Sequence, residues 1–173
     1  GVNAAKAITI NDGRLYAYAS NNDGIDSNGT MTINGGLVIG VGSNAPEAGI
    51  DIDNSNNFKV YGGVAIGYGA SLQSTPSTSS TQCSVAYGGV SGTQGKMIAL
   101  LDASAQPIVT FEFPRTISSA TLFITSPEIV KGSTYSFSGS GTLTDYTDTW
   151  QGWYQSGIWS SGSSLTTFTP SSV

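Results

Sequence analysis

The phrase Gly24-Ile25-Asp26 returns as Gly49-Ile50-Asp51, and each copy follows a strand-like run that a glycine turn opens. Other segments of the chain align on a shared pattern, in which apolar and polar residues alternate before a closing glycine. These segments are 8–13, 31–36, 58–63 and, more faintly, 84–89. Their closing glycines recur about every 25 residues, a period that fits one turn of a β-solenoid made of about three short strands.

The repeat predicts an all-β chain that winds as a parallel coil, because each turn can then pair with its neighbours alone. Equivalent residues of successive turns would stack in rows at the strand spacing of about 4.8 Å. We expect the turns of the coil at residues 4–95, with a Ser/Thr-rich loop at 71–82. Short strands at 96–141 would continue or cap the coil, and residues 142–173 form a tryptophan-rich tail.

Composition and charge exclude several classes of protein. Only 10% of the 173 residues are charged, whereas a helical cytosolic enzyme usually carries about a quarter charged residues. The net charge is −5 and the six basic residues are scattered, so nucleic acid is not an expected partner. No apolar stretch is long enough for membrane insertion. The single cysteine, Cys83, is expected to be a buried thiol.

The chain opens in the middle of a repeat and shows no signal peptide. We therefore expect that a targeting segment has been removed from an extracellular or bacterial cell-surface protein.

Acidic residues gather around the repeated phrase. They are Asp23, Asp26, Glu47, Asp51 and Asp53. If both copies occupy the same corner, Asp26 lies above Asp51, and the two carboxylates repel by about 1 kcal/mol in water and by more at a protein surface. Calcium would relieve this repulsion, because it accepts about six to eight oxygen ligands. The alternative is that these residues serve only the turn conformations that Asp and Asn tolerate.

Aromatic residues form a second group, on the strand that follows each glycine turn. Tyr16 aligns with apolar residues of the next two turns, and Tyr18 aligns with Tyr68. Both faces of this strand are apolar, so one face fills the coil. The other face is either covered by another segment or forms a platform for a sugar ring, with Tyr16, Tyr18 and Tyr68 as candidate ligand-binding residues.

The tail concentrates all three tryptophans of the chain. Trp150, Trp153, Tyr154 and Trp159 stand in a Gly/Ser-rich segment beside aspartate and glutamine residues. Aromatic faces next to hydrogen-bonding groups are a common means of binding carbohydrate, so these four residues are candidate ligand-binding residues. The alternative is that the rings plug the end of the coil or pack on its side.

The Asp-Gly-Ile-Asp phrase and the Gly-Gly turns also carry a resemblance to a known family. The segments that carry it are 22–29, 33–36, 49–53 and 61–63, followed by 101–103, 126–128 and 131–135. Over residues 4–140 the chain resembles bacterial carbohydrate-binding proteins that are pectate-lyase-like in shape but not catalytic. The resemblance implies a right-handed parallel β-helix, calcium binding at Asp23, Asp26, Asp51 and Asp53, and affinity for polygalacturonate or cellulose.

Catalysis is not expected. The chain has no histidine, so a Ser/His/Asp or Cys/His set cannot form. A lyase acting on an acidic polymer needs a base and supporting cations, and neither Arg14 nor Lys59 belongs to a basic cluster. A glycosidase would need paired carboxylates about 5–9.5 Å apart, which stacked aspartates could mimic.

The sequence therefore predicts a non-catalytic extracellular protein that binds polysaccharide, with an acidic plant-type chain such as polygalacturonate as the expected ligand. Calcium would stabilise the turns or bridge to uronate carboxylates, because a net-negative protein binds an acidic polymer poorly without a bridging cation. Two alternatives stay open: a structural or adhesive surface module without sugar binding, and a polysaccharide lyase.

Overall fold

The computed structural model describes residues 1–71 and 74–171. Within these residues the chain is all-β, apart from a single turn of 3-10 helix, η1 (Ser55–Asn57). It divides into two compact units, and each unit combines segments that are separate in the sequence. The first contains Gly1–Ser91 and Ile117–Val130, and the second contains Gly92–Thr116 and Lys131–Ser171. The expected segments 4–95, 96–141 and 142–173 are consecutive, whereas these units interleave along the chain.

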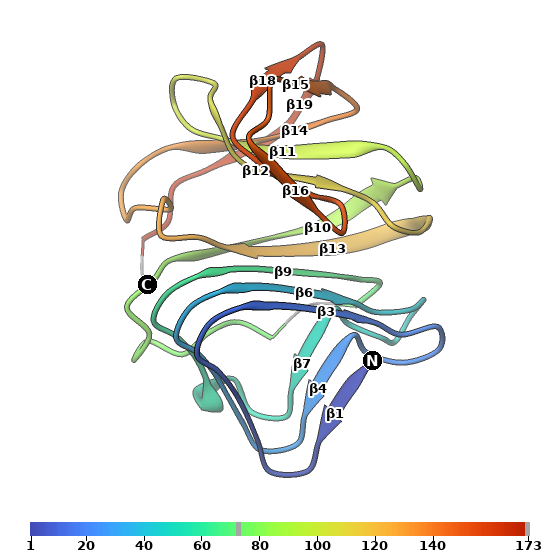
Figure 1. Ribbon diagram of the computed structural model, residues 1–173, viewed down its shortest axis with the longest axis vertical. Coiled ribbons are helices and arrows are strands. Elements are labelled where there is room, and N and C mark those ends of the chain that lie inside the picture. The colour runs from blue at the N-terminus through green and yellow to red at the C-terminus, as the bar shows by residue number, and fades with distance from the viewer. Residues whose placement is uncertain (72–73, 172–173) are drawn as a thin grey trace. The chain divides into compact units, whose positions relative to one another are not determined.

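The first unit begins with nine short strands arranged as three layers of three. The first layer is β1 (Val2–Ala4), β2 (Ala7–Ile10) and β3 (Arg14–Tyr18). The second is β4 (Ile25–Ser27), β5 (Thr30–Ile33) and β6 (Leu37–Val41). The third is β7 (Ile50–Ile52), β8 (Phe58–Val60) and β9 (Val64–Gly69). Each strand pairs in parallel with its equivalent in the next layer (Figure 1).

The repeated Gly-Ile-Asp phrase has a steric explanation. A Cβ added to Gly24 would lie 2.3 Å from the backbone nitrogen of Val41, and a Cβ added to Gly49 would lie 2.1 Å from that of Tyr68. Only glycine therefore permits this close approach of two backbones. The isoleucine of each phrase is fully buried, and the aspartate that follows is partly exposed.

The core of the first unit lies between the three sheets of these layers. Its buried members come from all three strands of a layer, as at Ile25, Met31 and Val38, and Phe123 packs among them. The rings of Phe58 and Phe123 lie 5.9 Å apart between centroids. Alternate side chains of each strand point to opposite faces, so the apolar–polar alternation of the repeat supplies this core.

The parallel layers end after β9. Strand β13 (Ile117–Thr125) pairs antiparallel with β9, and β10 (Ser84–Gly92) lies beyond β13, giving the five-stranded order β10-β13-β9-β6-β3. The segment 74–81 covers the edges of β7 and β8: the backbone N–H of Ser74 donates to Ile50 O (3.2 Å) and that of Ser77 donates to Phe58 O (2.7 Å).

The expectation of a right-handed parallel β-helix with a capping meander is wrong. The described residues form several short sheets of two to six strands, with both parallel and antiparallel pairing, instead of one continuous parallel coil. The segment 84–89 does not add a fourth turn, because β13 takes the place next to β9. The Thr125 hydroxyl helps to fix this arrangement: it donates to Cys83 O (2.9 Å) and accepts from Gln82 Nε2 (2.8 Å).

The second unit contains a six-stranded sheet and a two-stranded sheet. The strands are β11 (Met97–Leu101), β12 (Pro107–Glu112), β14 (Tyr135–Gly139), β15 (Thr142–Thr144), β16 (Asp148–Trp150), β17 (Trp153–Gln155), β18 (Ile158–Ser160) and β19 (Ser163–Phe168). The larger sheet has the order β16-β17-β12-β11-β14-β19, and β15 pairs with β18. Neighbouring strands of this larger sheet pair antiparallel.

The two faces of the six-stranded sheet differ in chemistry, because residues directly opposite in an antiparallel ladder share a face. One face is apolar and carries Trp153, Phe111, Val109, Leu100 and Phe137. The other is more polar and carries Tyr154, Thr110, Ala99 and Ser138. A side chain on the more polar face is therefore better placed to contact a polar ligand than a side chain on the apolar face.

Two smaller expectations concern Cys83 and the membrane. The Cys83 thiol is free and buried, as expected. No helix among residues 1–71 and 74–171 is long and apolar enough to cross a membrane.

Candidate functional site

The repeated aspartates meet in the first unit. Asp26 on β4 and Asp51 on β7 are direct neighbours in the parallel ladder, which confirms the register expected from the aligned phrases. Asp23 lies in the turn before β4 and Glu47 in the turn before β7. We refer to Asp23, Asp26, Glu47 and Asp51 as the acidic corner. Asp53 follows β7 and is exposed.

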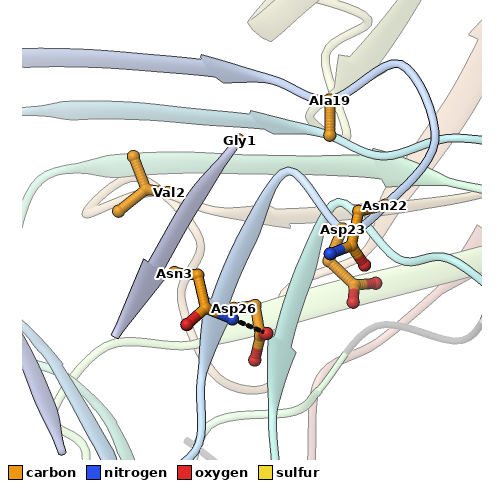
Figure 2. A pocket seen from close by; sticks show the side chains of 7 residues that line it. All are labelled: Gly1, Val2, Asn3, Ala19, Asn22, Asp23 and Asp26. Carbon is orange, nitrogen blue, oxygen red and sulfur yellow. Dashed lines mark hydrogen bonds between the residues drawn. The ribbon is translucent and has the colours of Figure 1, made fainter. Parts of the chain in front are cut away.

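Neutral groups donate hydrogen bonds to three aspartates of the acidic corner. The side-chain amide of Asn3 donates to Asp26 Oδ2, and Figure 2 shows the two side chains pointing toward each other from β1 and β4. The Ser74 hydroxyl donates to Asp51 Oδ1 over 3.4 Å. The backbone N–H of Ala48 donates to Asp23 Oδ1 over 2.5 Å.

Asn3 and Ser74 are absent from the candidates predicted from the sequence. Asn3 pairs in register with Asp26, and Val2 pairs with Ile25, so Gly1-Val2-Asn3 is an earlier form of the repeated phrase with Asn in place of Asp. This signal was present in the sequence. Ser74 lies in the irregular segment that closes the layers, where no repeat marks its position.

Three carboxyl groups of the acidic corner have raised pKa values. Burial raises the pKa of Asp26, and the charges of Asp23 and Asp51 raise it further, against the hydrogen bond from Asn3. Desolvation raises the pKa of Glu47, with repulsion from the Asp23 charge and a side-chain hydrogen bond to Asp23 adding to it. Desolvation and the charge of Asp23 raise the pKa of Asp51. The corner therefore favours a bound proton or another source of positive charge.

A small pocket opens beside the corner. It has a volume of about 160 Å³ and is lined by Gly1, Val2, Asn3, Ala19, Asn22, Asp23 and Asp26 (Figure 2). Its polar atoms are carboxylate, amide and backbone groups, which suit a small hydrated cation or the hydroxyl groups of a ligand better than an apolar molecule.

Calcium fits the donor chemistry of the acidic corner, because carboxylate, amide and hydroxyl oxygens are its usual ligands. The described part of the chain nevertheless contains no group of three or more Asp, Glu, His or Cys side chains arranged to hold one metal ion. A calcium ion bound at Asp26 and Asp51 would therefore need backbone or water oxygens to complete its ligands. Asp53 follows the end of β7 and is exposed, and its charge also raises the pKa of Asp26 and of Asp51.

The candidate tyrosines of the first unit do not form a continuous platform. Tyr68 is fully buried and cannot contact a sugar, so its assignment as a ligand-binding residue is wrong. Ile39 and Ile66, which align with Tyr16, are also fully buried. In the second and third layers this face of the strand is therefore covered by other residues and does not form a platform for a sugar ring. Tyr16 and Tyr18 stay close together on β3, with ring centroids 6.5 Å apart.

Two of the three tryptophans are packed within the second unit. Trp153 is buried on the apolar face of the sheet, opposite Phe111. The Trp159 indole donates from Nε1 to Ser138 Oγ over 2.9 Å. A Cβ on either Gly141 or Gly162 would come within 2.4 Å of the Trp159 ring, so the backbones of both glycines pack directly against the indole. Trp153 is therefore a packing residue. Trp159 is partly exposed and packs against two glycine backbones, and its assignment to sugar binding stays a prediction.

Tyr146 and Tyr154 lie together at the β16–β17 hairpin, Tyr154 on β17 and Tyr146 just before β16. Tyr154 lies on the polar face of the sheet and donates from its hydroxyl to Glu112 Oε2 over 2.8 Å. The Tyr146 ring meets the Tyr154 ring edge to face, with centroids 5.0 Å apart, and is 45% exposed. We call Tyr146, Tyr154 and Glu112 the aromatic hairpin site. Trp150 pairs with Trp153 and therefore lies on the other face of the sheet. Tyr146 and Glu112 were not predicted from the sequence as ligand-binding residues.

The aromatic hairpin site also has a defined electrostatic character. Desolvation raises the pKa of the Tyr154 hydroxyl, and the hydrogen bond to Glu112 and the Glu112 charge raise it further. The hydroxyl therefore keeps its proton and fixes the Glu112 carboxylate. The carboxylate can accept further hydrogen bonds, because each of its oxygens has more than one acceptor position.

Comparisons of the chain with protein-family models, with curated proteins and with solved structures found no match.

Proposed function

We propose that this protein is a non-catalytic polysaccharide-binding protein and that the aromatic hairpin site contacts the sugar. The observation that carries the proposal is the edge-to-face pair of Tyr146 and Tyr154 beside the fixed Glu112 carboxylate. An exposed aromatic face can stack on the C–H face of a pyranose, while a carboxylate accepts hydrogen bonds from the sugar hydroxyls. An extracellular location is part of the same proposal.

The charges of the hairpin bear on the class of sugar. Glu112, Asp145 and Asp148 are all acidic, and the whole chain has a net charge of −5. These charges disfavour direct contact with a uronate polymer and favour a neutral glycan such as a cello-oligosaccharide. Binding of polygalacturonate would need calcium between the two sets of carboxylates. We therefore propose direct binding of neutral glycan, and calcium-dependent binding of acidic glycan.

Calcium at the acidic corner is a separate proposal. The raised pKa values of Asp26, Glu47 and Asp51 support it, because the same repulsion that favours a proton also favours a cation. Asp26 and Asp51 would be the principal ligands, and the ion would stabilise the stacked layers.

The test of sugar binding is a glycan array followed by calorimetric titration with cellohexaose and with polygalacturonate, each in calcium and in EDTA. We expect cellohexaose binding that does not depend on calcium and polygalacturonate binding that does. Tyr146→Ala should weaken cellohexaose binding by about tenfold, the loss of roughly one stacking contact. Tyr61→Ala is the matched control, because Tyr61 is 42% exposed but belongs to the first unit.

The outcomes separate the alternatives. An array without hits in calcium buffer would reject sugar binding and favour a structural or adhesive module. Equal weakening by Tyr146→Ala and Tyr61→Ala would reject the aromatic hairpin site. Sustained release of unsaturated uronate from pectin would show a lyase, and sustained release of reducing ends without unsaturation would show a hydrolase, in place of a binding protein.

A further inference from the structure

The more polar face of the six-stranded sheet is partly exposed along the row that contains Glu112 and Met97. Thr110, Ala99 and Ser138 lie side by side on this face and are buried. Two residues further along their strands, Glu112 on β12 and Met97 on β11 are direct cross-strand neighbours on the same face, and both are partly exposed. A ligand on this side of the sheet can therefore contact Glu112 and Met97.

The aromatic hairpin site lies at one end of this row. Tyr154 belongs to β17, the neighbour of β12 in the sheet, and donates from its hydroxyl to Glu112 Oε2 over 2.8 Å. The Tyr146 ring meets the Tyr154 ring on this side of the sheet. The site proposed for sugar binding therefore continues along the sheet into Met97.

The Trp159 indole lies at the other end of the row, beside β14. The backbone N–H of Ser140, the residue after β14, donates to Met97 O over 2.9 Å. A Cβ on the next residue, Gly141, would lie 2.4 Å from Trp159 Cζ2, and Trp159 is partly exposed. The strand order β17, β12, β11 and β14 therefore corresponds to the residue order Tyr154, Glu112, Met97 and Trp159.

We infer that these four residues, which we call the cross-strand row, bind one extended β-1,4-linked chain of neutral sugars that runs across the strands. The inference rests on the sugar binding proposed above and adds the length and direction of the ligand. Neighbouring strands lie about 4.8 Å apart, and each sugar of an extended β-1,4-linked chain advances the chain by nearly the same distance. One sugar would therefore lie over each strand, which gives a chain of about four sugars over the row.

The side chains of the cross-strand row suit both kinds of surface that such a sugar presents. The rings of Tyr154 and Trp159 and the thioether of Met97 offer apolar surface to the C–H faces of the sugars. The Glu112 carboxylate accepts hydrogen bonds from sugar hydroxyls. Glu112 is also the one charged residue among the four, and a negative charge in the middle of the row opposes a uronate at that position. The row therefore favours a neutral chain.

The test is a calorimetric titration of the whole chain with cellobiose, cellotriose, cellotetraose and cellohexaose. We expect cellotetraose to bind about tenfold more tightly than cellobiose, and cellohexaose to bind no more tightly than cellotetraose. Trp159→Ala should remove this gain with length and leave cellobiose binding unchanged, because cellobiose still fits at the tyrosine end. Trp150→Ala is the matched control: Trp150 is also partly exposed but lies on the opposite face of the sheet.

A second measurement does not depend on the folding of Trp159→Ala. The indole N–H signals of the three tryptophans, assigned in the isotope-labelled wild-type chain, are followed by NMR during titration with cellotetraose. The Trp159 signal should shift, and the signals of Trp150 and Trp153, on the opposite face, should not. Circular dichroism checks the fold of each variant used for calorimetry.

The outcomes distinguish this inference from the proposed function. Equal affinity for cellobiose and cellohexaose, still weakened by Tyr146→Ala, would overturn the cross-strand row and leave sugar binding confined to the aromatic hairpin site. A Trp159 signal that cellotetraose leaves unchanged would also overturn the row. No binding of any of these oligosaccharides would reject direct binding of neutral glycan, and the cross-strand row with it.

Discussion

Asp26 and Asp51 lie directly opposite each other on neighbouring parallel strands, between the amide of Asn3 and the hydroxyl of Ser74. Parallel pairing gives two identical residues the same orientation, so their carboxylates are stacked at about the 4.8 Å strand spacing. The two hydrogen bonds do not compensate for the repulsion, since the pKa of each carboxyl remains raised. The stacked layers therefore contain a local destabilising feature that a change of charge can relieve.

Replacement of one stacked carboxylate should stabilise the protein. Asp51→Asn keeps the shape of the side chain and its hydrogen bond to Ser74 but removes one charge. At pH 7 we expect the free energy of unfolding to rise by about 0.5–1 kcal/mol, or roughly 1–4 °C in melting temperature. Differential scanning calorimetry measures the change. Asp145→Asn, an exposed position of the second unit, should leave the melting temperature unchanged, and an equal effect of both variants would contradict the explanation.

The stability of the protein should increase as the pH is lowered below neutrality. A carboxyl group with a raised pKa in the folded state holds its proton at a pH where the unfolded chain has lost it. Its contribution to stability is therefore complete below the pKa of the unfolded chain and is lost as the pH rises through the higher pKa of the folded state. The pKa values of Asp26, Glu47 and Asp51 are all raised in the folded state.

Urea unfolding at pH values from about 7 down to about 5 measures this effect, because the window begins above the ordinary pKa of a carboxyl group. The wild-type free energy of unfolding should rise across this range. The double variant Asp26→Asn with Asp51→Asn should show a clearly smaller rise. Parallel pH curves for the two proteins would mean that other carboxyl groups cause the dependence.

Calcium should raise the melting temperature if it binds the acidic corner. A ligand that binds only the folded state stabilises it by about 2.7 kcal/mol at a free concentration a hundred times its dissociation constant. Addition of EDTA should reverse the shift, and Asp26→Asn with Asp51→Asn should remove it. Sodium chloride at the same ionic strength is the control, because screening alone also weakens the repulsion. A melting curve that calcium and EDTA leave unchanged would count against the site.

The register of Asp26 and Asp51 could be predicted from the sequence, because two copies of one phrase on successive parallel strands must align. The extent of the parallel layers could not. The pattern at 84–89 resembles the earlier turns, yet β13 pairs with β9 in its place, and the choice between two distant strands does not appear in a local pattern. The aromatic hairpin site was only partly predictable for a similar reason, since Glu112 joins Tyr154 through a pairing of distant strands.

The sequence also did not reveal how far equivalent residues of successive layers differ in burial. Tyr18 and Tyr68 occupy equivalent positions in the first and third layers, but Tyr18 is 42% exposed and Tyr68 is fully buried. The repeat determines the position of a residue within its layer and the direction of its strand. The surroundings of that side chain depend on which layer it belongs to, and a repeat makes the layers look alike.

The glycine of the repeated phrase gives the most stringent test of the layered structure. In Gly49→Ala the new Cβ would lie 2.1 Å from Tyr68 N and 2.6 Å from Gly40 O, which are backbone atoms on two neighbouring strands. Neither can move without breaking the parallel ladder, so we expect a loss of about 3 kcal/mol or more in the free energy of unfolding. Gly24→Ala should behave alike, because its Cβ would lie 2.3 Å from Val41 N.

Gly88→Ala is the matched control for both substitutions. Gly88 lies in a strand of the same unit, but a Cβ there has Thr121 Oγ1 at 3.6 Å as its nearest neighbour, an ordinary contact. Urea unfolding should therefore separate Gly24→Ala and Gly49→Ala from Gly88→Ala, which should stay close to wild type. If all three variants were equally stable, the backbones would not approach each other at the corners, and the Gly-Ile-Asp phrase would need another explanation than the packing of successive layers.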